Sequence, residues 1–238
     1  MMKRSIGSSI TGVLDTIFPV FCVHCGDRLD VATESAALCN ECLDKIHGTV
    51  RHKAFYEVEE RVAGILPLGE MFYSMLYRDD TAEKEIILRG KYGDEPFLFR
   101  SLAEAFGKRL RRDGYFRDVS CVVPVPASNS KKKRRGYNQT RFIAEGLAKV
   151  LGIELIDEVL LRRDDGGGTQ TARSKEKRWQ AMENLFYCKS EDERLRGRRV
   201  LLVDDVLTTG ATLVHAAKAL FEESGVESIS FYTLSVDI

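Results

Sequence analysis

Residues 200–212 read VLLVDDVLTTGAT, and this stretch decides the fold. An apolar run ends in two adjacent aspartates, Asp204 and Asp205, and a turn of small and hydroxyl-bearing residues follows them. After the turn, apolar residues recur at helical spacing up to Gly225, which is a natural helix stop. This order predicts a buried strand that delivers two carboxylates to the edge of an α/β sheet, where ligands usually bind.

The residue types in the turn indicate a phosphorylated sugar as the ligand. Small residues at the start of a helix let backbone N–H groups converge on a phosphate. Carboxylates bind the hydroxyls of a sugar or a magnesium ion. An ordinary core strand followed by a capped helix is the alternative explanation of the same pattern.

This stretch resembles the motif with which type I phosphoribosyltransferases bind phosphoribosyl pyrophosphate (PRPP). The resemblance implies that the two aspartates hold the ribose 2- and 3-hydroxyls and that the turn wraps the 5-phosphate. It also implies Mg²⁺ bound together with PRPP, and it leaves the catalytic residues unknown. The PRPP-binding residues that it implies are Asp204, Asp205, Val206, Thr208, Thr209, Gly210, Ala211 and Thr212.

The composition describes a globular chain of 238 residues with no overall electrostatic preference. Lys plus Arg and Asp plus Glu number 36 each, so net charge favours neither nucleic acid nor a membrane. No apolar stretch is long enough to span a bilayer, so we expect no membrane insertion. The first residues suggest an amphipathic helix rather than a signal peptide because Asp15 interrupts the apolar run. We therefore expect a cytoplasmic protein.

Four cysteines form two C-x-x-C pairs, at 22–25 and 39–42. Two such pairs at this separation predict a tetrahedral zinc site whose ligands are Cys22, Cys25, Cys39 and Cys42. Disulfides are the alternative, which a cytoplasmic location disfavours. Because protein thiolates fill all four positions, the zinc is expected to be structural. Cys121 and Cys188 lie in apolar surroundings and are expected to pack as small hydrophobes.

Strand and helix patterns alternate through the rest of the chain, which predicts a mostly parallel sheet with flanking helices. Two domains are expected: residues 1–55 as a helix and zinc-finger-like segment, and residues 56–238 as the α/β domain. Helices are expected at 81–92, at 96–112 and before Gly152. The expected strands lie at 65–77 (a strand or hairpin), 119–125, 153–156, 159–162, 200–203 and 228–236.

A run of five basic residues, 131–135, lies in a predicted loop between a strand and a helix. Next to a phosphoribosyl site, this loop is the natural place for pyrophosphate, because one Arg guanidinium can bind two phosphate oxygens at once. The residues assigned to it are Lys133, Arg134 and Arg135. A solvated charged loop and a nucleic-acid patch remain open as alternatives.

A second segment, 162–186, contains three consecutive glycines followed by polar residues. Such a segment can close over a ligand and exclude water. Thr169, Gln170 and Arg173 are the residues of this expected flexible loop.

Taken together, the motifs resemble the ComF/GntX family of phosphoribosyltransferase-like proteins, which is associated with DNA uptake in bacterial competence. The resemblance rests on four pieces in order: the cysteine pairs, K-Y-G at 91–93, R-G-Y-N-Q at 135–139 with T-Q-T-A-R at 169–173, and the Asp-Asp turn. Lys133 stands where the family usually has an arginine.

Three functions stay open under this resemblance. The first is an enzyme that transfers a phosphoribosyl group to an unknown acceptor in DNA uptake or processing. The second is a non-catalytic module that binds single-stranded DNA through the basic run and exposed aromatic residues such as Tyr137. The third is an adaptor whose zinc segment docks on a competence helicase or a DNA-channel protein.

Overall fold

The computed structural model describes residues 20–29, 33–46, 53–77, 82–163, 182, 184–189 and 193–237. The described part begins with the cysteine pairs and continues into a large α/β unit. In chain order the elements are α2 (Asn40–Lys45), α3 (Lys53–Val62), β1 (Leu68–Tyr77), α4 (Ala82–Tyr92), α5 (Phe97–Asp113), β2 (Cys121–Pro124), α6 (Asn129–Arg135), α7 (Gln139–Leu151), β3 (Glu154–Leu155), β4 (Leu160–Arg162), β5 (Phe186–Cys188), the 3₁₀ turn η2 (Glu193–Leu195), β6 (Arg199–Leu207), α9 (Ala211–Ser224) and β7 (Ser228–Asp237).

Five strands form one parallel sheet in the order β1-β7-β6-β2-β3. The central strand is β6, which pairs with β2 on one side and β7 on the other. Its residues Val200–Val203 are buried on both faces, as the continuous apolar run requires. Strands β4 and β5 form a separate antiparallel pair. The predicted mostly parallel sheet is therefore confirmed.

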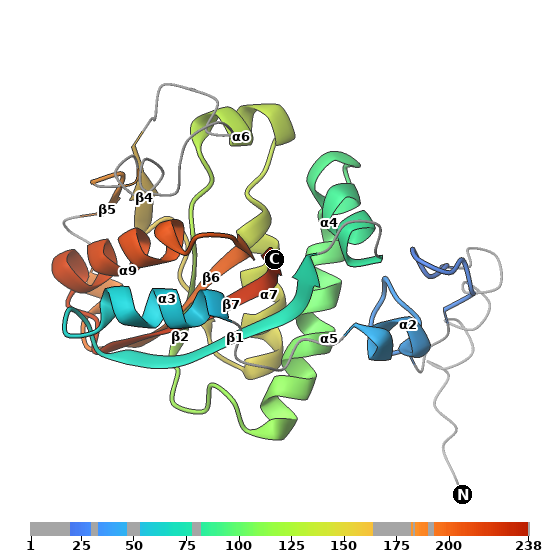
Figure 1. The fold of residues 1–238 in the computed structure, drawn as a ribbon, viewed down its shortest axis with the longest axis horizontal. Helices are drawn as coiled ribbons and strands as arrows, with labels where there is room; N and C mark the ends of the chain where they lie inside the picture. Colours follow the sequence, from blue (N-terminus) through green and yellow to red (C-terminus); the bar gives the residue numbers. More distant parts are fainter. Residues whose placement is uncertain are drawn as a thin grey trace, which may run out of the picture.

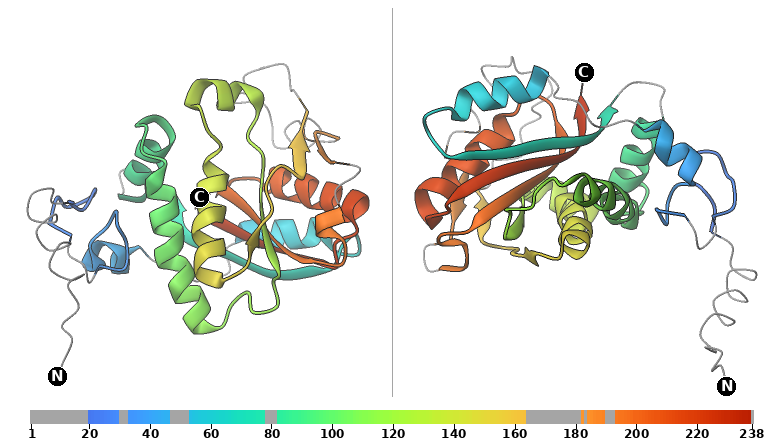
Figure 2. Two further views of the ribbon diagram at one scale, coloured as in Figure 1. Left: turned by 180° about the vertical axis from the view of Figure 1, so that it is seen from behind. Right: turned by 90° about the horizontal axis from the view of Figure 1, so that it is seen from below.

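Helices cover both faces of the sheet (Figures 1 and 2). Helices α3 and α9 lie on one face, and α5 and α7 lie on the other. Successive residues of β6 alternate between the two cores: Leu202 packs with the α3 and α9 residues, and Val203 packs with those of α5 and α7. The carboxyl end of β6 thus emerges between two well-packed layers, which fix its position.

Most of the predicted elements are present, with corrections at their ends. Residues 65–77 give the single strand β1 rather than a hairpin, and the strand expected to end at Val203 continues to Leu207 because it keeps pairing with β7. Gly152 and Gly225 end α7 and α9 in the left-handed conformation, as expected. Helix α3 and strand β5 were not predicted.

Helix α3 also crosses the predicted domain boundary at residue 55, and its apolar face belongs to the core of the α/β unit. The helix expected in the first residues lies outside the described part of the chain. Among the described residues, no helix has the length and apolar character needed to traverse a lipid bilayer.

Candidate functional site

Two carboxylates lie together at the end of β6. Asp204 is buried, and it pairs across the sheet with Thr233 of β7. Each carboxylate also accepts a hydrogen bond from the next backbone N–H: Asp204 from Asp205, and Asp205 from Val206, both at 2.8 Å. These short-range bonds orient both side chains at the mouth of the sheet.

A lysine from α4 neutralises one of the two carboxylates. Lys91 Nζ lies 2.9 Å from Asp205 Oδ2. Burial raises the pKa of Asp205, but the ion pair with Lys91 and the nearby charge of Lys131 outweigh burial and hold that pKa below its usual range. Burial and the charge of Asp205 raise the pKa of Asp204 to about 7. Asp204 therefore exchanges a proton close to neutral pH, whereas Asp205 stays ionised there.

The turn after the aspartates leads directly into α9. Gly210 has a φ of 74°, in the left-handed region that favours glycine, and α9 begins at the next residue. A β-carbon on Gly210 would lie 2.4 Å from Val58 Cγ2 of α3, so this position has no room for a side chain. Ala211 N–H donates to Thr209 Oγ1 at 3.4 Å, while the Thr208 side chain is exposed. The turn thus places the N-terminus of α9 and the hydroxyls of Thr208 and Thr209 directly after the aspartates in the chain.

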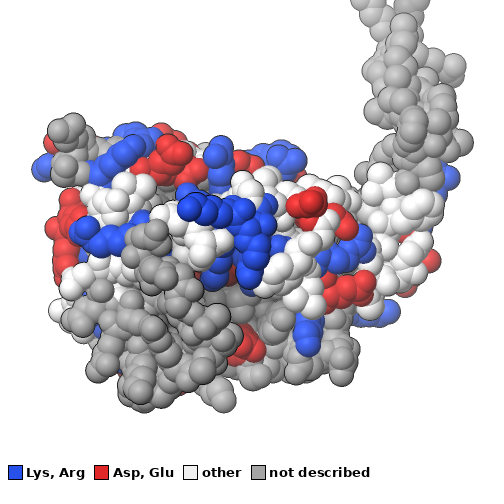
Figure 3. All heavy atoms as spheres, turned by 90° about the horizontal axis from the view of Figure 1, so that it is seen from above, with Lys and Arg blue, Asp and Glu red and all other residues white. Residues whose placement is uncertain are grey.

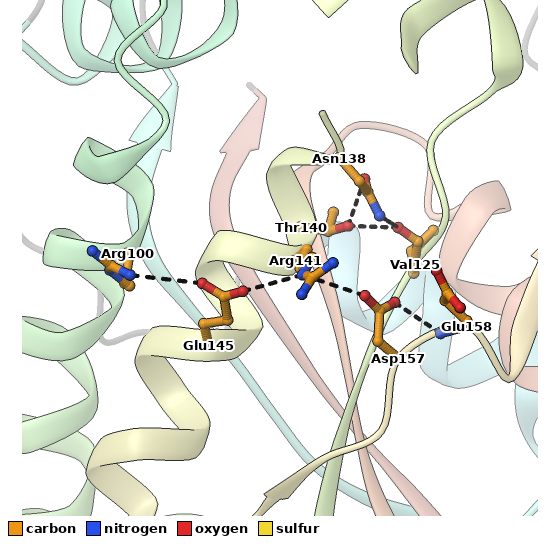
Figure 4. A network of polar contacts seen from close by, with 8 residues as sticks. All are labelled: Arg100, Val125, Asn138, Thr140, Arg141, Glu145, Asp157 and Glu158. Carbon is orange, nitrogen blue, oxygen red and sulfur yellow. Dashed lines mark hydrogen bonds and ion pairs between the residues drawn. The ribbon is translucent and has the colours of Figure 1, made fainter. Parts of the chain in front are cut away.

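The neighbouring motif R-G-Y-N-Q is held at the end of β2. Asn138 Nδ2 and Thr140 Oγ1 donate to the Val125 carbonyl at 3.1 and 2.5 Å (Figure 4). Asn138 stands at the N-cap position of α7, but its side chain makes no capping hydrogen bond and bonds Val125 instead. The start of α7 is therefore fixed to the strand next to β6.

An ion-pair chain extends this anchoring across the surface of α7 (Figure 4). Glu145 lies 3.8 Å from Arg100 of α5 and 3.1 Å from Arg141, whose Nε is 3.4 Å from Asp157 Oδ2. The chain links α5, α7 and the segment after β3. It supports the site from outside without reaching the aspartates.

The basic run forms a helix, α6, where a loop was predicted. Ser128 caps it, since its Oγ accepts the Lys131 N–H at 3.4 Å, and Gly136 ends it at a φ of 79°. The run therefore has a defined shape, and Lys132 and Lys133 are exposed on it. Lys131 is the α6 residue whose charge acts on both aspartates.

Two residues assigned to pyrophosphate stack on an aromatic ring. The guanidinium carbons of Arg134 and Arg135 lie 5.5 and 4.9 Å from the Tyr92 ring centroid. Arg135 also donates to the Tyr92 hydroxyl at 3.2 Å. Burial raises the pKa of Tyr92, but this hydrogen bond and the surrounding positive charges lower it overall. Tyr92 is 61% exposed, so this cation–π cluster faces solvent.

Seen from the side where α6 lies, Lys and Arg side chains gather in the centre of the face, with carboxylates on either side (Figure 3).

Tyr137, which was expected to be an exposed aromatic, is half-buried: its hydroxyl donates to the Gly90 carbonyl at 2.9 Å, and its ring packs on Phe142. Tyr92 is the exposed aromatic of this face instead.

The predicted residues 204–212 thus run from the end of β6 through a short turn into the start of α9, and the charge of Lys131 of α6 acts on both aspartates. Thr169, Gln170 and Arg173 lie outside the described residues, and their role stays a prediction. Lys91 was missed as a site residue. The K-Y-G motif drew attention to it, but only the folding of α4 toward the end of β6 shows which group the lysine contacts.

The cysteine pairs form a second candidate site. The residues Asn40–Lys45 make the short helix α2, with Cys39 at its N-cap, so Cys39 and Cys42 share one turn. In the other pair, Gly26 adopts a φ of 77° and donates its N–H to the Cys22 carbonyl at 2.9 Å. Both pairs are therefore bent into knuckles that present two thiols each.

The four thiols fit a tetrahedral metal. All four Sγ atoms lie within 4.8 Å of one another, and Cys25 Sγ is 3.7 Å from Cys39 Sγ. Four sulfurs at a zinc bond length of about 2.3 Å would be separated by about 3.8 Å. Burial raises the pKa of Cys22, but backbone hydrogen bonds from Cys25 and Cys39 lower it to about 6. The cluster of Cys22, Cys25, Cys39 and Cys42 can therefore hold a metal ion.

This metal knuckle, residues 20–46, is docked on α5. Ser35 Oγ lies 2.9 Å from Ser101 Oγ, and both residues are buried. Arg109 pairs with Glu34 at 3.0 Å and with Asp44 at 2.6 Å. The knuckle and the α5 and α7 layer also share one apolar core. The knuckle is thus packed against the α/β unit. Cys121 and Cys188 lie elsewhere in the core, buried as expected.

Comparisons with known proteins agree with this architecture. Residues 140–236 match the phosphoribosyl transferase domain family. The chain is 27% identical to competence protein F of Haemophilus influenzae over 90% of this chain and 96% of that protein. It is 26% identical to competence protein ComFC of Bacillus subtilis over 90% of this chain and 82% of that one.

Among solved structures, adenine phosphoribosyltransferase from Saccharomyces cerevisiae is similar at a TM-score of 0.37 and 16% identity, over 60% of this chain and 70% of that one. The domain match and the parallel sheet with its flanking helices together define a type I phosphoribosyltransferase fold. The chain is therefore similar to competence protein F and ComFC over most of its length, and its residues 140–236, which follow the four-cysteine knuckle, match the phosphoribosyl transferase domain.

Proposed function

We propose that this protein binds PRPP with Mg²⁺ at the end of β6 and acts in competence, in the uptake or processing of DNA. The observation that carries the proposal is the pair of the buried Asp204 and the partly buried Asp205 beside the Gly210 turn. The carboxylates accept the ribose hydroxyls, and the turn at the start of α9 binds the 5-phosphate through its N–H groups. The names of the relatives support the role in competence.

In transfer of the phosphoribosyl group, the acceptor would form a bond to the anomeric carbon of the ribose. The bond between that carbon and the pyrophosphate would break, and pyrophosphate would leave with the bonding electrons. Bound Mg²⁺ supplies charge neutralisation for the departing pyrophosphate. The protein's own contribution is position and charge: Asp204 and Asp205 orient the sugar, and Lys133, Arg134 and Arg135 of α6 supply cations for the leaving group. Thr169, Gln170 and Arg173 would cover the sugar during transfer.

Calorimetric titration of PRPP with Mg²⁺ tests this proposal. Wild type is expected to bind PRPP. The Asp204→Asn/Asp205→Asn variant is expected to lose at least about tenfold in affinity, because two carboxylates that accept hydrogen bonds from the ribose hydroxyls are replaced by neutral amides. Glu222→Gln, an exposed carboxylate of α9, is the matched control and should bind as wild type does. Equal binding by wild type and the double variant would refute the assignment.

For the knuckle we propose a structural zinc ion held by Cys22, Cys25, Cys39 and Cys42. Four thiolates complete a tetrahedral shell and leave no open position for a substrate. The ion would stabilise a segment that is too small to hold a core of its own. Reduced thiols of this kind are consistent with a cytoplasmic location, which we propose as well.

A second candidate function, binding of single-stranded DNA, is favoured by the exposed Tyr92 and the basic residues around it. Bases stack on aromatic rings, and cations attract the phosphate backbone. Tyr92→Ala should weaken binding of a labelled oligothymidylate in fluorescence anisotropy, whereas Asp204→Asn/Asp205→Asn should not. If both variants bind as wild type does, this face does not bind DNA.

A third candidate is an adaptor role for the knuckle toward a competence helicase or a DNA-channel protein. Val20 and Phe21 are each 53% exposed beside the first cysteine pair, and exposed apolar residues favour protein contacts. Phe21→Ser should then reduce binding to such a purified partner while leaving PRPP binding intact. Unchanged partner binding would remove this candidate.

A further inference from the structure

Lys91 is the residue on which this inference rests. It lies in the last turn of α4, outside the residues 140–236 that match the phosphoribosyl transferase family. Its ion pair with Asp205 is partly shielded from water, since the two side chains are 16% and 20% exposed. An ion pair in such surroundings is stronger than one on the open surface.

The two residues before Lys91 are held by other parts of the chain. Arg89 Nη1 donates to the Val23 carbonyl of the metal knuckle at 3.2 Å. The Gly90 carbonyl accepts the Tyr137 hydroxyl at 2.9 Å, which ties the same turn to the start of α7. The position of the Lys91 backbone relative to the end of β6 is therefore fixed by these neighbours. Only the Lys91 side chain has to move for its ammonium group to reach another partner.

A second lysine, Lys131 of α6, also acts on the same carboxylates. Lys131 is exposed, and its charge favours the ionised form of both Asp204 and Asp205. The ammonium group of Lys91 thus contacts Asp205 directly, and the charge of Lys131 adds to the positive potential at both carboxylates. A neutral sugar alone gives these cations no anionic partner, whereas a sugar joined to a pyrophosphate does.

We propose that Lys91 exchanges partners on ligand binding, from Asp205 to the pyrophosphate oxygens of PRPP. The inference rests on the proposed function and deepens it. Ribose hydroxyls replace the ammonium group at Asp205, and the released Lys91 keeps three N–H donors for phosphate oxygens. No proton or covalent bond changes in this step.

Because of this exchange, binding of the ribose 5-phosphate part of PRPP and binding of its pyrophosphate part depend on each other. Ribose 5-phosphate breaks the Lys91–Asp205 pair without offering the lysine a new anion. PRPP breaks the same pair and supplies the pyrophosphate that takes its place. Loss of the lysine should therefore weaken PRPP binding and leave ribose 5-phosphate binding unchanged or tighter.

The test measures both ligands, each with Mg²⁺, by calorimetry on the full chain. Lys91→Met should lose at least about tenfold in affinity for PRPP, because charge-assisted hydrogen bonds to phosphate disappear. Its affinity for ribose 5-phosphate should fall by no more than about threefold, or rise, since an ion pair no longer has to be broken. Lys132→Met, an exposed lysine of α6, is the control and should match wild type for both ligands.

The outcomes separate this inference from the function on which it rests. If wild type binds neither ligand, both fail. If wild type binds PRPP and Lys91→Met binds it equally well, the partner exchange is wrong and the PRPP site stands. If Lys91→Met loses both ligands to the same extent, the lysine only supports the shape of the site and the exchange is again wrong.

Discussion

A β-carbon placed on Gly210 would lie 2.4 Å from Cγ2 of Val58. The contact joins the turn after the aspartates to α3, a helix that comes more than a hundred residues earlier in the chain. Because Val58 is fully buried, it has no room to retreat. The shape of the phosphate turn is therefore set by a helix that lies outside the matched family region.

Gly210→Ala is expected to destabilise the protein and to weaken PRPP binding. A left-handed alanine costs about 1–2 kcal/mol, and overpacking against Val58 adds about 1–3 kcal/mol. Gly152→Ala is the matched control, because Gly152 has the same φ of 74° with nothing within 4 Å of its β-carbon. Urea denaturation should show a clearly larger loss for Gly210→Ala; equal losses would mean that the Val58 contact is unimportant.

The buried aspartate predicts a pH dependence of stability. Asp204 has a pKa of about 7 in the folded protein, against about 3.9 for an unperturbed aspartate. Between these values the folded chain binds more protons than the unfolded chain, so this group makes the free energy of unfolding fall as pH rises. One proton gives a slope of up to about 1.4 kcal/mol per pH unit.

Asp204→Asn should remove that contribution. Urea denaturation of wild type and the variant at several pH values between about 4 and about 7 compares the two slopes directly. The difference in unfolding free energy should shift progressively in favour of the variant as pH rises. A constant difference across this range would show that Asp204 is ionised throughout.

The parts of this site that could be predicted from the sequence are those whose residues are close together along the chain. The β6–turn–α9 unit was predictable because an apolar run, two aspartates, a small-residue turn and a helical pattern are contiguous. Both cysteine knuckles were predictable for the same reason. Helix α6 was missed because five adjacent like charges disfavour a helix, although Ser128 and Gly136 were a cap and a stop in the right places.

Contacts between distant segments could not be predicted in this way. Nothing near Lys91 in the sequence indicates that α4 ends over β6, because that placement comes from the packing of α4 and α5 on the sheet. The contact of Val58 with Gly210 likewise depends on how α3 lies over the same end of the sheet. The residues of the β6–turn–α9 unit could thus be predicted from the sequence, whereas the residues of distant segments that contact this unit could not.

Removal of a knuckle cysteine should abolish metal binding. Cys42→Ser is expected to lose the single bound zinc ion, because an alcohol is a far weaker zinc ligand than a thiolate. Elemental analysis of the purified protein measures the zinc content directly. Cys188→Ser, a buried cysteine outside the cluster, should keep one ion per chain. Zinc retained by Cys42→Ser would contradict the four-thiolate site.

Arg109 is expected to secure the knuckle on α5. Arg109→Ala removes the pairs with Glu34 and Asp44 and should cost about 1 kcal/mol, since the partners are partly exposed. Hydrogen exchange should accelerate in residues 33–46 and much less in the sheet. Arg112→Ala, whose side chain is 68% exposed on the same helix, is the control. Exchange that is unchanged in the knuckle would show that Ser101 and the apolar contacts suffice.

Phosphorus NMR of PRPP in the presence of Mg²⁺ tests the central claim most directly, because the 5-phosphate and the two pyrophosphate phosphorus atoms are observed separately. Binding at the β6 end predicts that all three resonances shift or broaden with wild type and that none does with Asp204→Asn/Asp205→Asn. Resonances that stay unchanged with folded, zinc-loaded wild type would contradict the account.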